Sequence, residues 1–262
     1  IRRRIKTMKL ESLFDLKGHT ALITGSSRGI GRAIAMALAE AGANVIIHGV
    51  HAGDNLQNAV QEAATFNIQA FGVAGDISNQ DGVRAMLDEC RKLPVKPDIL
   101  VLNASVQSYQ KIEEFTAEEC IRQYQTNLMA NFSIIKEFID EMKEKKWGRI
   151  LAIGSVNQYK PSPLLPIYAS SKAALTNLMV NCARQYSQFG ITANNLAPGV
   201  ITTDRNREAL KDEAYKQKLI NAIPAGHFGT PEDCAGLALL LCSNAGRYIT
   251  GADIPVAGGM QL

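Results

Sequence analysis

Short runs rich in β-branched residues alternate with longer helical segments along almost the whole chain. Strands are expected at 20–24, 43–49, 68–74, 98–103, 148–154 and 191–197, and 252–256 can supply a last one. Several of these runs are almost continuously apolar, as in strands that are covered on both faces. Helices are expected at 30–42, 54–67, 79–92, 117–145, 166–188 and 231–243. Strict alternation requires right-handed crossover connections, so the chain is predicted to form an α/β fold with a parallel, doubly wound sheet and helices on both faces.

Residues 13–262 are expected to form one domain. The chain has 262 residues, of which 46% are hydrophobic, and this is enough for a single large core. No internal repeat or change of composition marks a second domain. Residues 1–12 are interpreted as an N-terminal extension. The polar and charged segment 200–225 lies between a strand and the next helix, where open α/β sheets bind ligands, and it predicts a lid.

Composition argues against several other classes of protein. The net charge of +3 is too small to indicate a nucleic-acid or membrane partner, so a nucleic-acid binder would depend on the basic segment 1–7 alone. No apolar run approaches the roughly 18 residues that span a bilayer, and the head lacks the apolar segment of a secretory signal. Four histidines without metal-like spacing predict no metal site. The cysteines are odd in number and form no C-x-x-C, which favours reduced thiols in the cytoplasm; they are Cys90, Cys120, Cys182, Cys234 and Cys242.

A glycine-rich turn, TGSSRGIG, follows the first expected strand. Its glycines, Gly25, Gly29 and Gly31, permit a tight turn and a close approach of the backbone to a ligand. The helix that begins there directs its N-terminus at the same place, as in sites that bind a pyrophosphate. Such a turn can also serve only strand-to-helix packing, so by itself it is weak support for a dinucleotide site.

A tyrosine and a lysine, Tyr168 and Lys172, lie one turn apart in the segment PIYASSKAAL. Residues at i and i+4 share one face of a helix, so the phenol and the ammonium group are expected side by side. A tyrosine and a lysine at this spacing, without other motifs, are usually an amphipathic tyrosine beside an exposed lysine and have no catalytic role.

In this order and spacing, TGSSRGIG, NAS after the fourth strand, a serine after the fifth and YASSK on the next helix resemble the short-chain dehydrogenase/reductase family. The resemblance covers the chain from about residue 13 to its end. It implies a Rossmann-type sheet of about seven strands, a nicotinamide cofactor, and a homotetramer in which the long helices pair across two-fold axes. The long helices carry more apolar residues than packing against one face of the sheet requires, which agrees with such pairing. Examples are Met129, Phe132, Leu178 and Met179.

The resemblance assigns catalytic roles to Asn127, Ser155, Tyr168 and Lys172. A phenol with an ordinary pKa of about 10 is a poor base at neutral pH, and an adjacent ammonium group lowers that pKa. Tyr168 is therefore interpreted as the general acid/base and Lys172 as the charge that tunes it and holds the nicotinamide ribose. Ser155 is expected to donate to the substrate oxygen. Asn127 is expected to hold a water in a proton relay, with a buried structural hydrogen bond as its alternative.

Further cofactor contacts follow from the resemblance. In the glycine turn they are Gly25, Ser27, Arg28, Gly29, Ile30 and Gly31. Beyond it they are Asp76, Ile77, Asn103, Tyr168, Lys172, Pro198, Gly199, Ile201 and Thr203. The chain departs from the family pattern where Leu102, Ser105 and Ala257 replace an asparagine, a glycine and an aspartate, and the first two leave the backbone near the nicotinamide ribose less defined.

The cofactor is predicted to be NADP(H) in preference to NAD(H). Enzymes that prefer NAD place a carboxylate at the end of the second strand, but Gly49 stands there and the nearest acid is Asp54. Arg28 lies inside the glycine turn, where related enzymes bind the 2′-phosphate with a basic residue, and His48 or His51 can assist.

The substrate stays open between two classes of compound. Residues 155–166 are expected to form a polar wall of the site, with Ser155, Asn157 and Tyr168 contacting the substrate. A basic lid with Arg205, Arg207 and Lys211 would suit an anionic sugar acid or polyol.

The segments LFDLKGHTALITGSSRGIG and LAPGVITTD also resemble gluconate 5-dehydrogenases. The same lid suits 3-oxoacyl-[acyl-carrier-protein] reductase, whose carrier partner is acidic. A non-catalytic dinucleotide-binding regulator is the alternative from another class, but all four catalytic positions are occupied by the expected residues.

Overall fold

The computed structural model describes residues 9–204 and 211–262. One parallel sheet runs through the molecule in the order β3-β2-β1-β4-β5-β6-β7. Its strands are β1 (Thr20–Ile23), β2 (Asn44–Gly49), β3 (Ala70–Ala74), β4 (Ile99–Leu102), β5 (Gly148–Ile153), β6 (Ile191–Pro198) and β7 (Asp253–Val256). The predicted fold class is confirmed, including the last strand at the edge of the sheet.

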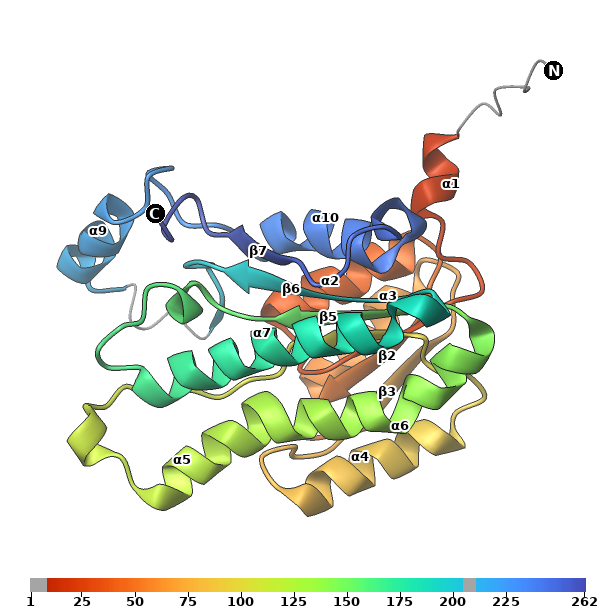
Figure 1. The fold of residues 1–262 in the computed structure, drawn as a ribbon, viewed down its shortest axis with the longest axis horizontal. Helices are drawn as coiled ribbons and strands as arrows, with labels where there is room; N and C mark the ends of the chain where they lie inside the picture. The colour runs from red at the N-terminus through yellow and green to blue at the C-terminus, as the bar shows by residue number, and fades with distance from the viewer. Residues whose placement is uncertain (1–8, 205–210) are drawn as a thin grey trace.

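Helices cover both faces of this sheet (Figure 1). One face carries α4 (Gln80–Lys92), α6 (Ala130–Lys145) and α7 (Pro166–Tyr186), and the other carries α2 (Gly29–Glu40), α3 (Asp54–Ala64) and α10 (Pro231–Cys242). The remaining described α-helices are α1 (Leu10–Phe14), α5 (Ala117–Tyr124) and α9 (Glu213–Asn221). Short 3₁₀ turns occur at Ile112–Glu114, Val156–Gln158, Ser187–Phe189 and Asn244–Gly246. No helix of the described part of the chain is both long enough and apolar enough to cross a membrane.

Two hydrophobic cores lie on opposite faces of the sheet because successive strand residues point in opposite directions. In β1, Leu22 packs into the core under α4, α6 and α7, whereas Ala21 and Ile23 pack under α2, α3 and α10. All four residues of β1 are buried, as are all four of β4. This double burial explains why the strands read as continuous apolar runs rather than as alternating ones.

The order of the strands reverses between β1 and β4, since β2 and β3 lie to one side and β5 to β7 to the other. In open α/β sheets, the crevice at the carboxyl ends of the strands next to such a reversal is where ligands bind. The connections that leave β1, β4, β5 and β6 all begin at this edge. They carry the glycine turn, Asn103, Ser155 and the Pro198–Gly199 segment.

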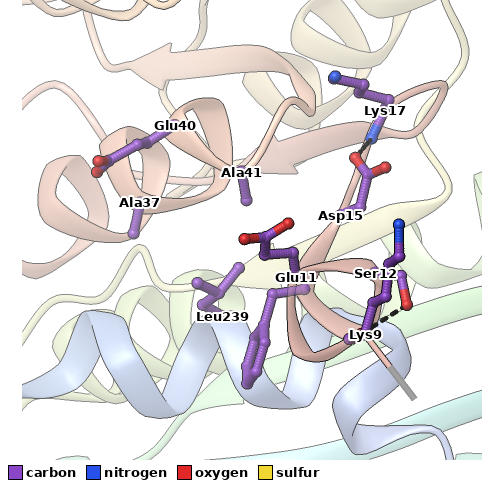
Figure 2. A pocket seen from close by; sticks show the side chains of 10 residues that line it. Lys9, Glu11, Ser12, Asp15, Lys17, Ala37, Glu40, Ala41 and Leu239 are labelled. Carbon is purple, nitrogen blue, oxygen red and sulfur yellow. Dashed lines mark hydrogen bonds between the residues drawn. The ribbon is translucent and has the colours of Figure 1, made fainter. Parts of the chain in front are cut away.

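An open groove of about 590 Å³ lies at the amino ends of the strands, opposite the crevice at their carboxyl ends (Figure 2). Its lining includes Glu11, Asp15 and Lys17, which precede β1, and Glu40 at the end of α2. The Lys17 backbone N–H donates to the Asp15 carboxylate at 3.1 Å. Because these residues lie at the amino ends of the strands, the groove is separate from the crevice that holds the predicted site.

Candidate active site

The turn between β1 and α2 depends on its glycines. Gly25 and Gly29 have φ angles of +63° and +60°, which L side chains rarely adopt. A Cβ atom on Gly31 would lie 2.5 Å from Asn103 Nδ2 and 2.7 Å from the Gly25 carbonyl oxygen. The turn therefore packs closely against the chain that leaves β4, and it opens the N-terminus of α2 into the crevice. Such an N-terminus is suited to an anionic group.

Asn103 and Thr24 fix this turn from the neighbouring strand. Asn103 Nδ2 donates to the carbonyl oxygens of Thr24 and Gly25 at 2.8 and 3.0 Å. The buried Thr24 hydroxyl oxygen accepts from the N–H groups of Asn103 and Ala104, both at 3.0 Å. Asn103 thus lies at the predicted place, but its side-chain nitrogen is used to shape the glycine turn. Thr24 was not among the predicted site residues, although a hydroxyl at the end of an apolar strand is a usable signal for it.

His48 is buried behind the glycine turn and not directed at a ligand. Its Nδ1 accepts from the Gly25 N–H at 3.0 Å, and its Nε2 lies 2.9 Å from the Gly75 carbonyl oxygen. Burial lowers the pKa of His48, and the Gly75 carbonyl and the Asp76 carboxylate oppose this only in part. The ring is therefore neutral with its hydrogen on Nε2. The suggestion that His48 assists in binding a 2′-phosphate is wrong, because both ring nitrogens bind backbone groups; His51 is exposed.

Arg28 is exposed at the position that precedes the first residue of α2. A Cβ atom on Gly49, the last residue of β2, would lie 3.7 Å from the Ser27 Cβ and 3.4 Å from the His51 carbonyl oxygen. The end of β2 and the glycine turn are therefore in direct contact. This places Arg28 and Gly49 on neighbouring segments, as the prediction of cofactor choice requires. Ser27 and Ile30 are half-buried in the same turn.

Asp76 and Ile77 follow β3 at the same edge of the sheet. Asp76 is exposed, and its Oδ1 accepts from the Ser78 N–H at 3.0 Å. Ile77 is only 3% exposed and packs into the core beneath α4. Its side chain therefore serves packing.

Tyr168 and Lys172 lie in the first turns of α7, which begins at Pro166 as expected of proline in a first helical turn. Lys172 is 1% exposed, and its Nζ donates to the Ile153 carbonyl oxygen at 2.7 Å. The same nitrogen lies 5.6 Å from the centre of the Tyr168 ring. The lysine is therefore anchored at the carboxyl end of β5 and is not an exposed lysine beside a surface tyrosine.

Asn127 lies in a π-helical turn, η2 (Gln125–Met129), that interrupts the helix predicted over 117–145. Its Oδ1 accepts from the Val106 N–H at 2.9 Å, and its Nδ2 donates to the Val106 carbonyl and to Ser171 Oγ, both at 3.0 Å. Ser171 in turn donates to the Tyr168 carbonyl at 2.7 Å. π-Turns inside α-helices are frequent at functional sites. The fully buried Asn127 thus joins the loop after β4 to the turn of α7 that carries Tyr168.

Glu119 holds the outer part of that loop. Its carboxylate accepts from Ser108 Oγ, from Arg122 at 2.7 Å and from Gln123 at 2.9 Å. The Arg122 hydrogen bond is the largest cause that lowers the pKa of Glu119 to about 2. The carboxylate stays charged at neutral pH and fixes the loop against α5.

Ser155 follows β5 and is 6% exposed. Its Oγ accepts from the Asn157 N–H and from Asn157 Nδ2 at 3.2 and 3.3 Å, and its own N–H donates to Gln158 Oε1 at 3.1 Å. With two hydrogen bonds accepted, the Ser155 hydroxyl retains its O–H as a donor. Asn157 also accepts from the Ser162 N–H at 3.0 Å, so it closes the loop that leads to α7.

The chain after β6 borders a cavity of about 360 Å³ whose lining includes Ile201, His227 and Val256. Pro198 ends β6, and a Cβ atom on Gly199 would lie 2.8 Å from the Ala257 Cα. Ile201 is buried, whereas Thr203 is half-buried with its side chain 3.5 Å from the Cβ position of Gly29. The predicted lid residues Arg205 and Arg207 lie outside the described residues, and Lys211 is exposed.

Hydrogen bonds and close contacts join several of the predicted site residues at the carboxyl ends of the strands. Asn127 is connected to the Tyr168 backbone through Ser171. Lys172 lies beside the Tyr168 ring and donates to the carbonyl of Ile153, which precedes Ser155 by two positions. Thr203 lies near the glycine turn. Sequence reasoning did not identify Ser171 as part of the site, because its partner Asn127 is distant in the chain. In the described part of the chain, no group of three or more His, Cys, Asp or Glu side chains is arranged to bind a metal ion.

A family model described as enoyl-(acyl carrier protein) reductase matches residues 25–261. The chain is 35% identical over 249 residues to 3-oxoacyl-[acyl-carrier-protein] reductase FabG of Aquifex aeolicus, covering 94% of this chain and 98% of that one.

Two solved structures are similar over almost their whole length. One is a 3-oxoacyl (acyl-carrier-protein) reductase from Agrobacterium tumefaciens with NADP bound, with a TM-score of 0.92, 36% identity and coverage of 98% and 100%. The other is a gluconate 5-dehydrogenase from Burkholderia cenocepacia in complex with NADP and tartrate, with a TM-score of 0.89, 31% identity and coverage of 96% and 98%.

Proposed function

This chain belongs to the short-chain dehydrogenase/reductase family of oxidoreductases, and from that premise we propose that it interconverts a secondary alcohol and a ketone with Tyr168 as the general acid/base. The observation that carries the proposal is the anchored Lys172. Its buried ammonium group donates to the Ile153 carbonyl and lies beside the Tyr168 ring. A positive charge in this place favours the phenolate form and so makes the tyrosine a better base.

Ser155 and Asn127 complete the proposed mechanism. The Ser155 O–H, held by two hydrogen bonds from Asn157, donates to the substrate oxygen and stabilises the charge that develops on it. Tyr168 transfers the proton to or from the same oxygen. Asn127 keeps α7 in register with the loop after β4 through Ser171. Its side-chain bonds to Val106 favour the structural alternative for its amide, and its contribution to a proton relay stays a proposal.

A nicotinamide dinucleotide fits the crevice. The glycine turn leaves no room for a Cβ at Gly31 and presents the N-terminus of α2, which suits a pyrophosphate. When bound, such a cofactor supplies or accepts the hydride. Gly25, Gly29 and Gly31 would hold its phosphates and Lys172 its ribose. The remaining proposed contacts are Ser27, Arg28, Ile30, Asp76, Ile77, Asn103, Tyr168, Pro198, Gly199, Ile201 and Thr203.

The cofactor is proposed to be NADP(H) rather than NAD(H). Arg28 is exposed at the glycine turn, and the neighbouring Gly49 presents no carboxylate that would repel a 2′-phosphate. The two solved relatives described above were determined with NADP. Both observations support NADP, and the preference rests on the first.

The substrate is proposed to be a sugar acid or polyol. Asn157, whose amide donates to Ser155 Oγ, is proposed to line the wall of the site, and an amide there suits a hydroxylated compound. Reduction of a 3-oxoacyl thioester is the second candidate, and the similarity to 3-oxoacyl-[acyl-carrier-protein] reductases supports it. A lid over 200–225 is part of either proposal.

A panel assay at the nicotinamide absorbance band tests the function, with sugar acids, polyols and acetoacetyl-CoA in parallel. Turnover of gluconate above acetoacetyl-CoA supports the first candidate, and the reverse order supports the second. A chain that binds NADP but turns over no member of the panel would favour the non-catalytic regulator.

A homotetramer is proposed from the long helices. Met129 and Phe132 are 47% and 48% exposed although both are large and apolar. Leu178 is partly buried against the core and Met179 is 1% exposed, so the use of Met179 as a sign of an interface was wrong. The exposed apolar side chains near the π-turn remain the support for pairing between subunits.

A cytoplasmic location is proposed from the cysteines. All five are free thiols, and four of them are buried. Burial raises the pKa of Cys90, Cys234 and Cys242 to about 12, so these thiols are unreactive.

A further inference from the structure

We infer that Gln158 and Asp253 form a positioning pair that sets the conformation of the turn carrying Ser155. The inference rests on the proposed catalytic role of Ser155 and adds two residues to it. Neither side chain is assigned contact with substrate or cofactor. Asp253 would act through Gln158, and Gln158 through the backbone of Ser155.

The amide of Gln158 bridges the Ser155 turn and the edge strand. Its Oε1 accepts from the Ser155 N–H at 3.1 Å. Its Nε2 donates to both carboxylate oxygens of Asp253, at 3.0 and 2.8 Å. Gln158 is three residues beyond Ser155, whereas Asp253 is the first residue of β7. Gln158 therefore connects the Ser155 turn to β7, which is the last strand of the chain.

Asp253 determines which end of the Gln158 amide faces Ser155. A carboxylate only accepts hydrogen bonds, so it must face the NH₂ group of the amide. The carbonyl oxygen of the amide is then directed at the Ser155 N–H, which only donates. In the reversed orientation, the amide NH₂ group would face the Ser155 N–H, so that two donors meet. The amide oxygen would face the Asp253 carboxylate, so that two acceptors meet. Both oppositions leave a polar group without its hydrogen bond, so the observed orientation of the amide is favoured.

The surroundings of the pair are built for this arrangement. Asn195, paired in register with Asp253, is fully buried and donates to Asp253 Oδ1 at 2.7 Å. A Cβ atom on Gly154 would lie 2.4 Å from Gln158 Oε1 and 2.5 Å from Asn195 Nδ2. A glycine directly before Ser155 is thus what allows both amides to lie over the turn.

The position of Ser155 depends on the turn that Gln158 closes. The Ser155 side chain caps the 3₁₀ turn Val156–Gln158, while Gln158 returns to the Ser155 backbone. Loss of the Gln158 contact frees the backbone at the residue whose O–H must face the substrate oxygen. A shift of a few tenths of an ångström there weakens an oxyanion hydrogen bond more than it weakens binding of the ground state.

The test uses full-length variants, with turnover of gluconate and of acetoacetyl-CoA as probes and NADP⁺ binding measured by fluorescence titration. Gln158→Met removes the hydrogen bonds to Ser155 and to Asp253 at nearly constant volume. We expect kcat to fall about 10- to 100-fold, with KM and the NADP⁺ Kd within about twofold. Gln158→Glu places two carboxylates together and is expected to lose at least as much activity.

The reciprocal exchange decides the proposal. In Gln158→Glu combined with Asp253→Asn, the new carboxylate accepts from Ser155 and the new amide donates to it, so the hydrogen-bond pattern is restored with the roles exchanged. We expect kcat to return to within about threefold of the parent, well above the product of the two single effects. A double variant that is no more active than Gln158→Glu would overturn the pairing.

Asn194→Leu is the matched control. Asn194 is a buried neighbour on β6 that donates to the Ile249 carbonyl at 2.8 Å and accepts from the Ala252 N–H at 3.0 Å. It holds the entry to β7 without contacting the Ser155 turn, so its loss is expected to lower the melting temperature and leave kcat unchanged. An equal fall of kcat in this variant would show that Gln158 and Asp253 act only on stability.

Ser155→Ala separates failure of this inference from failure of the proposed function. If Ser155→Ala keeps the parental kcat, the proposed function loses its oxyanion donor. If Ser155→Ala is inactive but Gln158→Met is fully active, only the positioning pair is refuted. A crystal structure of Gln158→Met with the Ser155 turn unmoved would refute the pair in the same way.

Discussion

The His48 ring accepts a hydrogen bond from the Gly25 N–H at 3.0 Å, so a buried neutral imidazole supports the glycine turn from behind. Its other nitrogen lies 2.9 Å from the carbonyl oxygen of Gly75. The ring thus connects the ends of β1, β2 and β3 beneath the proposed cofactor site. Protonation would place an N–H on Nδ1 opposite the Gly25 N–H and break this connection.

The first prediction is a loss of stability on acidification. The pKa of His48 is lowered in the folded protein, so below the unfolded value of about 6.5 the unfolded chain binds more protons. The stabilisation is complete above that value and is lost as the pH falls toward the lower, folded pKa. The free energy of unfolding should therefore decrease from pH 7 to pH 5, by up to about 1.4 kcal/mol per pH unit for this one group. Urea titrations of the parent and of His48→Gln measure it.

His51→Gln is the control, because His51 is exposed next to the same strand. It should keep the parental slope, whereas His48→Gln should flatten it. An unchanged slope in His48→Gln would assign the pH dependence to other groups.

The second prediction concerns the proposed acid/base. Tyr168→Phe should keep the fold, because the ring that packs beside Lys172 remains. It should lower kcat by about 10³-fold, since the proton donor is lost. NADP⁺ titration and circular dichroism should match the parent. Residual activity above about a tenth would show that Tyr168 is not the general acid/base.

The third prediction concerns cofactor choice. A charge-assisted hydrogen bond from Arg28 to a 2′-phosphate should give NADPH a kcat/KM about 10- to 100-fold above that of NADH. Arg28→Ala should remove most of this preference. Gly49→Asp should reverse it by adding repulsion, and the space around the Gly49 Cβ position accommodates a side chain.

Arg32→Ala is the matched control for Arg28. Arg32 lies in the first turn of α2, close to Arg28 in the chain, but pairs with Glu62 at 2.6 Å, so its loss should leave the preference unchanged. A parent enzyme that uses NADH as well as NADPH would contradict the assignment of Arg28.

The fourth prediction concerns assembly. Light scattering of the parent at micromolar concentration should give the mass of four chains. Phe132→Asp should reduce this mass, because a carboxylate would replace an exposed apolar side chain at the proposed interface. Tyr248→Asp, at a fully exposed position, should not. A monomeric parent would refute the tetramer.

Local patterns in the sequence were sufficient to locate the elements of the fold and the motifs on them. Strands that are buried on both faces are continuous apolar runs, whereas apolar residues in helices recur at the helical period. All seven strands were therefore located within two residues of their observed ends. The glycine turn and the Tyr168–Lys172 pair were also visible, because each is set by the local backbone. These features are set by residues that are close together in the sequence, so local sequence patterns are enough to predict them.

Contacts between side chains that are distant in the chain could not be predicted in this way and became visible in the folded structure. The single helix predicted over 117–145 contains a π-turn, with Asn127 bonded to Val106 on a separate segment. His48 supports the glycine turn by accepting from the Gly25 N–H and is not directed at a phosphate. Gln158 meets Asp253 because β7 pairs with β6 in one register, and a shift of that register by one residue would point the carboxylate to the other face. Such contacts depend on the packing of whole elements, which no local period encodes.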